Sequence, residues 1–353
     1  MGLSAGKLDH EGGGADPHCR PDRGKAPSRL RAGGPAGGLI LFLSYILVAW
    51  AACADPVRLA TWHGDFSRKG PGLLLADLEK APPDLGPILA TGPDILLLTD
   101  VDYDAGLVAL GKLRDLLADQ GLRYPHLFAL RPNTGMATGL DIDGDGYRGG
   151  PRDAQGFGWF AGQGGMALLS RYPVELGADH SALLWKDAPD SAIAADDPAH
   201  DVQRLSTSAH WALRVATPGG SLTLLTLAAT PPVFDGPEDR NGRRNRDEVL
   251  LWTHVLEGKV GAVPDTPVAL IGNLNLDPSR GNGLQEAARQ VLEHARLQDP
   301  MPGVDTVTWD STGPMRVSYV LPDRALSVTG RGVTPPSPDL GPHGLVWVDL
   351  TLP

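Results

Sequence analysis

The sequence predicts an α/β protein in which buried strands deliver polar side chains to one end of a sheet. The main observation is the segment Ala269–Pro278 (ALIGNLNLDP), where apolar residues and a glycine are followed by Asn273 and Asn275. This pattern is typical of a buried strand with polar side chains at its carboxyl end. A second such run, Asp94–Val101 (DILLLTDV), contains Asp100 near its end. Segments with helical spacing alternate with these runs, and polar strand ends of this kind indicate a functional site.

Further strands and helices follow from the same hydrophobic patterns. Leucines after Gly106 recur at helical spacing until Gly121 ends the pattern. Strands are expected over Val57–Trp62, Met166–Ser170, Gln203–Val215, Ser221–Leu227, Met315–Leu321 and Leu345–Leu350, with the third and fourth of these paired. Helices are expected over Leu73–Lys80, Gly106–Gln120, Asp247–Leu256 and Leu284–Ala295. The Ala/Asp-rich segment Glu175–Asp201 has no pattern and is expected to be a surface excursion.

The composition limits the fold and the partners. With 353 residues and 42% hydrophobic content, the chain can bury a large core in one large domain or two modest ones. Its formal net charge of −11 argues against a protein that holds nucleic acid chiefly through Lys and Arg contacts to phosphates. The sequence therefore carries no strong nucleic-acid signal. It predicts contact with a membrane only through its N-terminal segment.

The N-terminal residues are predicted to direct export rather than to join the fold. Residues 1–38 form a polar, basic leader, and the apolar part of residues 39–54 is shorter than the roughly 20 residues that span a bilayer. Residues 39–54 are expected to be a signal-peptide core that ends in a small-residue cleavage site, which places the mature protein in the periplasm or outside the cell. A retained membrane anchor and a lipoprotein acylated on Cys53 stay open as alternatives. Because Cys19 and Cys53 are the two cysteines of the chain, the exported part has no disulfide.

A short acidic loop follows the first helices. Asp141, Asp143 and Asp145 alternate before Gly146, which matches the first half of an EF-hand-type calcium loop. The position that should hold a bidentate glutamate carries Arg152 instead. The three aspartates are therefore candidate Ca²⁺ ligands, and a plain acidic turn is the alternative.

Several phrases of the chain resemble one known family. The phrase GMALLSRYP begins at Gly165, and TPPVFDGPEDRNGRRNRDE begins at Thr230. Together with the strand at Ala269 and the C-terminal LVWVDL, they resemble the endonuclease/exonuclease/phosphatase superfamily, in particular an exported bacterial branch. The resemblance extends from Val57 to the C-terminus and implies a single domain over residues 55–353. It also implies a four-layer α/β sandwich of the DNase I type, with two mixed sheets flanked by helices, and phosphoester hydrolysis that depends on Mg²⁺ or Mn²⁺.

The resemblance also assigns the family's site to particular positions. These positions are His63, Asp100, Ala228, Asn273, Asn275, Ser318 and His343. Only Asn275 and His343 keep the family's residue type. Asp100 stands at the metal position in place of a glutamate, and His63 replaces an asparagine beside the phosphate. His343 occupies the general-base position.

Three of the replacements remove a functional group. Asn273 stands where an aspartate handles the attacking water, and Ser318 where an aspartate orients the catalytic histidine. Ala228 replaces a histidine that contacts the phosphate, and a methyl group donates no hydrogen bond. Because all three losses fall on the family's site, the sequence predicts a degenerate active site and a catalytically impaired binding or structural module.

Two alternatives to this interpretation stay open. One is an active phosphoesterase with a rearranged site, in which His63, Asp100 and Asp102 gather the metal. The other is a calcium-stabilised envelope protein without a ligand. For the impaired binding module, the ligand is expected to be phosphorylated or otherwise anionic. The cationic side chains that would bind it are Arg240, Arg243 and Arg244, although the same arginines can instead pair with neighbouring acids.

Overall fold

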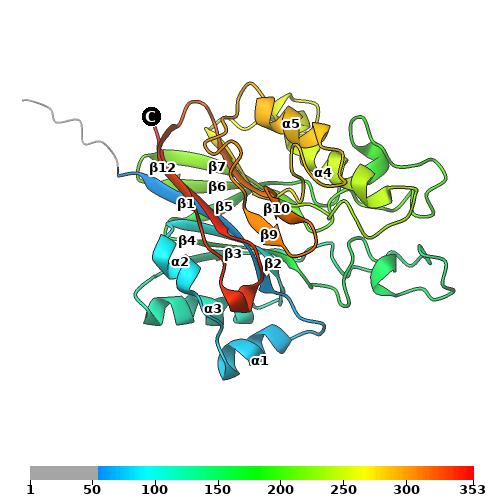
Figure 1. Cartoon of the computed structure of the whole chain (residues 1–353), viewed down its shortest axis with the longest axis horizontal. Coiled ribbons are helices and arrows are strands. Elements are labelled where there is room, and N and C mark those ends of the chain that lie inside the picture. The colour runs from blue at the N-terminus through cyan, green and yellow to red at the C-terminus, as the bar shows by residue number, and fades with distance from the viewer. Residues whose placement is uncertain (1–54) are drawn as a thin grey trace, which may run out of the picture. The chain divides into compact units, whose positions relative to one another are not determined.

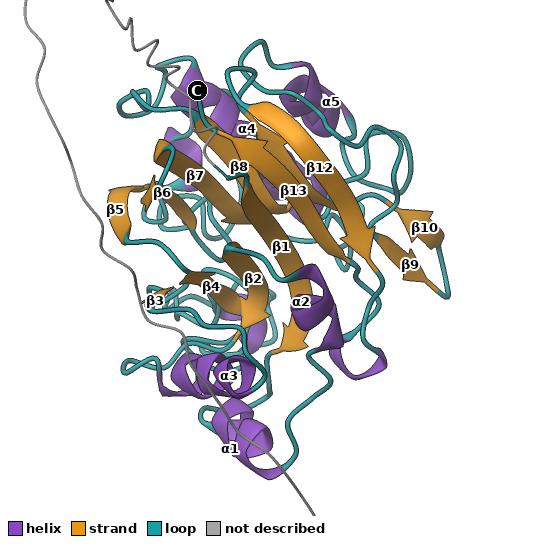
Figure 2. Cartoon of the chain, turned by 90° about the vertical axis from the view of Figure 1, so that its left-hand side faces the viewer, coloured by secondary structure: helices purple, strands orange, loops and turns teal. Residues whose placement is uncertain are grey.

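Two mixed β-sheets lie face to face in the structure, a computed structural model that describes residues 55–353 (Figure 1). Helices cover the outer faces of the sheets, so the described residues form four layers (Figure 2). This arrangement confirms the predicted four-layer α/β sandwich. The described residues belong to one compact unit.

The predicted leader and signal-peptide core, residues 1–38 and 39–54, lie outside the described residues. Export, membrane anchoring and acylation therefore stay predictions from the sequence. Within residues 55–353, no helix combines the length and the apolar character that crossing a membrane requires.

The first sheet has six strands in the order β12-β13-β1-β2-β4-β3. They are β1 (Val57–Phe66), β2 (Ile95–Val101), β3 (His126–Phe128), β4 (Gly165–Ser170), β12 (Ser327–Thr334) and β13 (Leu345–Thr351). β1 and β2 are parallel, whereas the other neighbouring strands pair antiparallel. The carboxyl ends of β1 and β2 therefore lie at the same edge of the sheet.

The second sheet repeats this feature with five strands in the order β11-β8-β7-β6-β5. They are β5 (Val174–Asp179), β6 (His210–Thr217), β7 (Gly220–Ala228), β8 (Val268–Asn273) and β11 (Ser318–Pro322). β7 and β8 form its parallel pair. A separate hairpin of β9 (Val307–Trp309) and β10 (Gly313–Met315) is joined by a β-bridge from Val307 to His343, just before β13.

The helices complete the outer layers. α1 (Leu73–Lys80), α2 (Gly86–Thr91) and α3 (Val108–Asp119) pack on the first sheet, and α4 (Arg240–Leu256) and α5 (Glu286–Glu293) pack on the second. The central core lies between the sheets, where Leu97, Trp211 and Ile271 are fully buried. All six residues of β8 are buried, because one face of this strand meets the other sheet and the other face meets the helices.

Several predicted boundaries were wrong for identifiable reasons. α4 begins at Arg240 rather than at Asp247. The prediction missed its first turns because they are polar: their buried side chains form hydrogen bonds, and the sequence there has no hydrophobic period. At its start, the Asp235 carboxylate accepts the free backbone N–H of Asn241. The strand predicted over Met315–Leu321 is two strands, since the chain leaves β10 after Met315 and enters β11 at Ser318.

The region before β6 also differs from the prediction. The strand expected from Gln203 begins only at His210. The expected surface excursion contains the edge strand β5, and Trp185 within it is fully buried in a small cluster against α4. A buried indole needs a partner for its N–H, and Asp247 accepts it at 2.6 Å. α2, β3, β9 and β12 were not predicted, because they are short or, in β12, interrupted by glycines.

Candidate functional site

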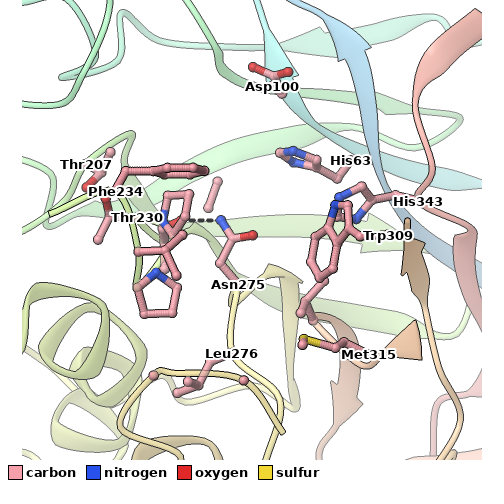
Figure 3. A pocket seen from close by; sticks show the side chains of 18 of the residues that line it. His63, Asp100, Thr207, Thr230, Phe234, Asn275, Leu276, Trp309, Met315 and His343 are labelled. Atoms are coloured by element: carbon pink, nitrogen blue, oxygen red, sulfur yellow. Dashed lines mark hydrogen bonds between the residues drawn. The ribbon is translucent and has the colours of Figure 1, made fainter. Parts of the chain in front are cut away.

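A cavity of about 750 Å³ lies where the two parallel strand pairs end. His63 and Asp100 reach it from β1 and β2, while Ala228 and Asn275 reach it from the ends of β7 and β8. His343, just before β13, lines it as well. Figure 3 shows His63 beside His343, with Asp100 and Asn275 on different sides of them. Residues far apart in the sequence, which the resemblance assigns to one site, therefore do line one cavity.

Asp100 enters the cavity through an irregularity in its strand. The pairing of β2 with β4 shifts register between Thr99 and Val101, and Asp100 between them has a φ of 63°. Such a bulge redirects one side chain away from the regular alternation of the strand. Burial raises the pKa of the Asp100 carboxyl, and the neighbouring His63 opposes this effect.

His63 is held from its own sheet. Its Nδ1 lies 2.9 Å from Thr99 Oγ1 on the neighbouring strand β2. Burial lowers the pKa of His63, although Asp100 favours its charged form. The charge of each of these two side chains therefore affects the pKa of the other across the parallel strand pair.

His343 lacks the group that would make it an effective base. It is 5% exposed, and its ring lies 4.5 Å from the ring of His63 and 5.5 Å from that of Trp309, measured between centroids. Its Nδ1 finds no hydrogen-bond partner among residues 55–353. Burial, and then His63, lower the pKa of His343 to about 3, so the imidazole is neutral near pH 7. A buried histidine without a carboxylate has neither a fixed tautomer nor a partner for its charged form.

Ser318 and Asn273 occupy the two positions where the family resemblance implies aspartates. They lie opposite each other in the pairing of β11 with β8, and both side chains are 1% exposed. The Ser318 hydroxyl is, like His343 Nδ1, without a partner in the described part of the chain. The Asn273 amide is engaged with Asn275, since its Oδ1 accepts Asn275 N–H at 2.9 Å and its Nδ2 donates to Asn275 Oδ1 at 3.0 Å. Asn273 therefore holds the turn after β8 and does not line the cavity.

Ala228 and Asn275 both line the cavity, but only the Asn275 side chain can form hydrogen bonds. Asn275 Nδ2 donates to Ala229 O at 2.7 Å, so the amide ties the end of β8 to the end of β7. Ala228 lies opposite Asn273 in the same parallel pair and presents only a methyl group. This part of the cavity wall can position a ligand but offers no acid or base.

Within residues 55–353, the cavity offers few ligands to the divalent metal that the family resemblance implies. Among the described residues, Asp100 is the one carboxylate of the lining without an ion pair, because Asp277 binds Arg280 at 2.9 Å. Asp102 does not line the cavity, and its oxygens accept the backbone N–H groups of Arg68 and Gly164. Mg²⁺ is usually held by one or two carboxylates together with waters and the phosphates of a substrate. The predicted metal-binding set of His63, Asp100 and Asp102 is therefore reduced to His63 and Asp100. Within residues 55–353, no cluster of three metal-binding side chains occurs at the cavity.

A cluster of acidic side chains lies instead in the loop at Asp141, Asp143 and Asp145. Their ligand atoms lie within 4.8 Å of one another, which is compatible with one cation. The Asp141 carboxylate also accepts the backbone N–H groups of Gly144 and Gly146. Hydrogen bonds to the backbone therefore contribute to the conformation of this loop.

Asp153, which follows the position of the missing twelfth ligand, binds the backbone of the loop. The buried carboxylate of Asp153 accepts backbone N–H groups from Ile142, Gly149 and Gly150. Asp153 thus closes the loop by binding its backbone. The described structure brings together the three aspartates that the sequence singled out, and it leaves the ion unspecified.

The three arginines predicted to bind substrate do not line the cavity. Arg240 binds Asp197 at 2.6 Å and Gln203 at 2.8 Å. Arg244 is 4% exposed and donates to three backbone carbonyl groups, and Arg243 donates to two. The structure therefore supports the structural alternative for these side chains, with partners different from the acids that the sequence suggested.

The polar face of α4 holds one wall of the cavity, a role that sequence reasoning missed. Buried Glu248 accepts the backbone N–H groups of Thr207 and Thr230, and both threonines line the cavity. Asn245 Nδ2 donates to the carbonyl groups of Thr230 and Leu274. The available signal in the sequence was an acid four residues after an arginine, here Arg244. The same spacing is typical of exposed ion pairs on a helix, so it did not indicate burial.

Known proteins resemble the chain in sequence and in fold. The sequence model of the endonuclease/exonuclease/phosphatase family matches residues 73–347. A search of curated proteins gave no match. The structure of an endonuclease/exonuclease/phosphatase from Beutenbergia cavernae has 19% identity and a TM-score of 0.53, covering 84% of this chain and 72% of that one.

Two further solved structures show similar values. An endonuclease/exonuclease/phosphatase from Bacteroides vulgatus is 14% identical with a TM-score of 0.50, and the match covers 84% of this chain and 99% of that one. Sphingomyelinase C from Streptomyces griseocarneus is 15% identical with a TM-score of 0.47, and the match covers 83% and 99%. At these identities, the structural likeness concerns the fold alone.

Proposed function

The chain belongs to the endonuclease/exonuclease/phosphatase family, and on that premise we propose that it is a catalytically impaired member retained as a binding module. The observation that carries the proposal is the isolation of His343. Its Nδ1 is buried without a hydrogen-bond partner among the described residues, and Ser318, which stands where the family has an aspartate, has no carboxylate to offer. The expected general base therefore lacks both orientation and charge compensation.

The rest of the cavity supports the same conclusion. Metal-assisted phosphoester hydrolysis needs carboxylates that hold the cation and activate water, and the cavity has a single carboxylate without an ion pair among residues 55–353. The Asn273 amide is occupied by Asn275. Removal of one preorganised catalytic group typically costs about two to three orders of magnitude in rate, and several are missing together here.

The proposal predicts that the full-length protein does not hydrolyse phosphomonoesters or phosphodiesters in the presence of Mg²⁺ or Mn²⁺. Its rates should equal those of His343→Ala and Asp100→Asn, because no residue of the cavity can activate water. Release of phosphate or of a chromogenic alcohol, followed over days, measures this. Melting temperatures of the variants verify that each protein is folded.

An active phosphoesterase with a rearranged site is the competing hypothesis. It requires turnover that depends on a divalent cation and is abolished by both substitutions. Such a result would refute the impaired-enzyme proposal, whereas turnover that survives both substitutions would identify a contaminating enzyme.

For the acidic loop, we propose Ca²⁺ as the ion of Asp141, Asp143 and Asp145, since their three carboxylates converge and calcium prefers such oxygen ligands. A ligand present at about 100 times its Kd stabilises the folded state by about 2.7 kcal/mol. We therefore expect added Ca²⁺ to raise the Tm of the protein, and a chelator to reverse the effect. Asp143→Ala should abolish the shift while Asp104→Ala, an acid outside this loop, should keep it.

Equal Tm values with Ca²⁺ and with chelator would favour the plain acidic turn. Isothermal titration with Mg²⁺ separates this loop from the cavity, because heat that disappears in Asp100→Asn but persists in Asp143→Ala would reveal a cavity metal.

A further inference from the structure

Apolar and aromatic side chains form most of the cavity wall that surrounds the degenerate site. Trp309 from β9 and Met315 from β10 line one side. Phe234, in the loop between β7 and α4, lies on the opposite side, with Asn275 between them (Figure 3). A volume of about 750 Å³ accommodates a small organic molecule, for which lining by aromatic groups is usual. The wall therefore offers a place for an apolar ring.

Two aromatic side chains at this site are strongly exposed. Phe234 is 81% exposed and Phe157, another lining residue, is 58% exposed. Exposed apolar side chains that gather at a cavity form a surface of the kind that ligand-binding grooves present. A ring that enters between Phe234 and Trp309 would remove part of this apolar area from water.

The charges of the cavity oppose an anionic ligand. Arg280 is the sole Lys or Arg among the lining residues, and its guanidinium binds the carboxylates of Asp277 and Asp305. No free cation of the described residues is therefore directed at a phosphate. The expected arginines, Arg240 and Arg244, are bound to other groups of the protein and lie outside the lining.

Asp100 gives the cavity the opposite preference. It is the lining carboxylate without an ion pair within residues 55–353, and it lies at the end of the cavity with His63, away from Met315 and Leu276 (Figure 3). An ammonium group satisfies an unpaired carboxylate, and the faces of aromatic rings also attract cations. Burial raises the pKa of the Asp100 carboxyl, and an ammonium group beside it would favour the charged form. Ring walls together with this acid are complementary to a ring-bearing amine.

We propose that the cavity binds a small ring-bearing amine, with its ring between Phe234 and Trp309 and its ammonium group toward Asp100. This inference rests on the proposed function, because it assigns the ligand class of the same impaired site. The phosphorylated or anionic ligand that the sequence suggested is the competing occupant.

Three matched compounds test the inference on the full-length protein. Phenethylamine, 2-phenylethanol and phenyl phosphate share a benzene ring and carry a positive, neutral and negative group. Saturation-transfer NMR with competition gives their dissociation constants in the presence of a chelator, and phosphate release from phenyl phosphate is measured in the same samples. We expect the amine to bind about tenfold more tightly than the alcohol, which is the effect of one favourable charge contact, and the phosphate to bind most weakly.

Substitutions test which residues contact the ammonium group of the ligand and which contact its ring. Asp100→Asn should make the amine and the alcohol bind equally, while both still bind. Trp309→Ala should weaken all ring compounds by about tenfold, as is typical for loss of a central tryptophan. Phe234→Ala is a second wall variant that leaves the core intact, since Phe234 is 81% exposed. Leu176→Ala, an exposed position on β5 away from the cavity, should leave all constants unchanged.

The outcomes distinguish this inference from the function it rests on. Tightest binding of phenyl phosphate without turnover overturns the ligand assignment alone. An amine that binds no better than the alcohol, or constants that neither wall variant changes, also overturns it. Turnover of phenyl phosphate contradicts the proposed loss of catalysis, whichever compound binds. Preferential binding of the amine without turnover supports both.

Discussion

Glu248→Ala is expected to lower the free energy of unfolding by about 3–5 kcal/mol, because two backbone N–H groups lose their acceptor at about 1–3 kcal/mol each. Glu248 is fully buried on α4 and accepts the backbone N–H groups of Thr207 and Thr230. Burial raises the pKa of Glu248 to about 7, and the charge of its carboxylate opposes the lowering of the Arg244 pKa by burial. Alanine would leave two N–H groups unpaired and one cation without its counter-charge. Denaturant unfolding monitored by tryptophan fluorescence measures the loss.

Two related variants make the cause of this loss identifiable. Glu248→Gln keeps the volume and one acceptor oxygen, so it should lose less than the alanine variant. Glu257→Ala removes an acid just after α4 that pairs with Lys259 and has a side chain 43% exposed, so its change should stay below about 1 kcal/mol. A Glu248→Ala protein within about 1 kcal/mol of the wild type would show that the network on α4 does not stabilise the cavity wall.

Gly272→Ala is expected to cost more than about 4 kcal/mol, or to prevent accumulation of folded protein. Gly272 lies within β8 with a φ of +140°, and a Cβ placed there would lie 1.9 Å from the carbonyl oxygen of Leu227. That oxygen belongs to the adjacent parallel strand β7, so neither strand can move without disturbing the pairing. The yield of soluble protein and its Tm measure the effect.

Gly303→Ala is the matched control for backbone conformation. Gly303 also has a positive φ, +74°, but a Cβ there meets nothing within 4 Å. Its cost should be limited to the strain of a left-handed backbone, about 1–2 kcal/mol. If the two alanine variants lost the same stability, steric contact between β7 and β8 would not be the reason for glycine at position 272.

The elements with a clear period were the ones that the sequence predicted well. α1 has the predicted bounds, Leu73–Lys80, and β8 follows the apolar run that begins at Ala269. Hydrophobic periodicity reports which face of an element meets a core, so it finds elements whose stability comes from that face. It does not detect the first turns of α4, where Arg244 and Asn245 are buried through polar contacts.

In the candidate site, too, some residues were predictable from the sequence and others were not. His63, Asp100, Asn275 and His343 meet at one cavity because strand ends gather at one edge, a result that follows from topology once the family is recognised. The apolar wall was not predictable in this way. Phe234 and Trp309 come from a loop and a short hairpin, whose positions depend on contacts distant in the sequence.

The separation between the central core and the cavity has a consequence for how such a protein can evolve. The side chains packed between the sheets, such as Leu97 and Ile271, are not those at the strand ends, such as His63 and Asn275. Substitutions at the strand ends can therefore accumulate without loss of the folded state, and selection on chemistry can relax independently of selection on stability.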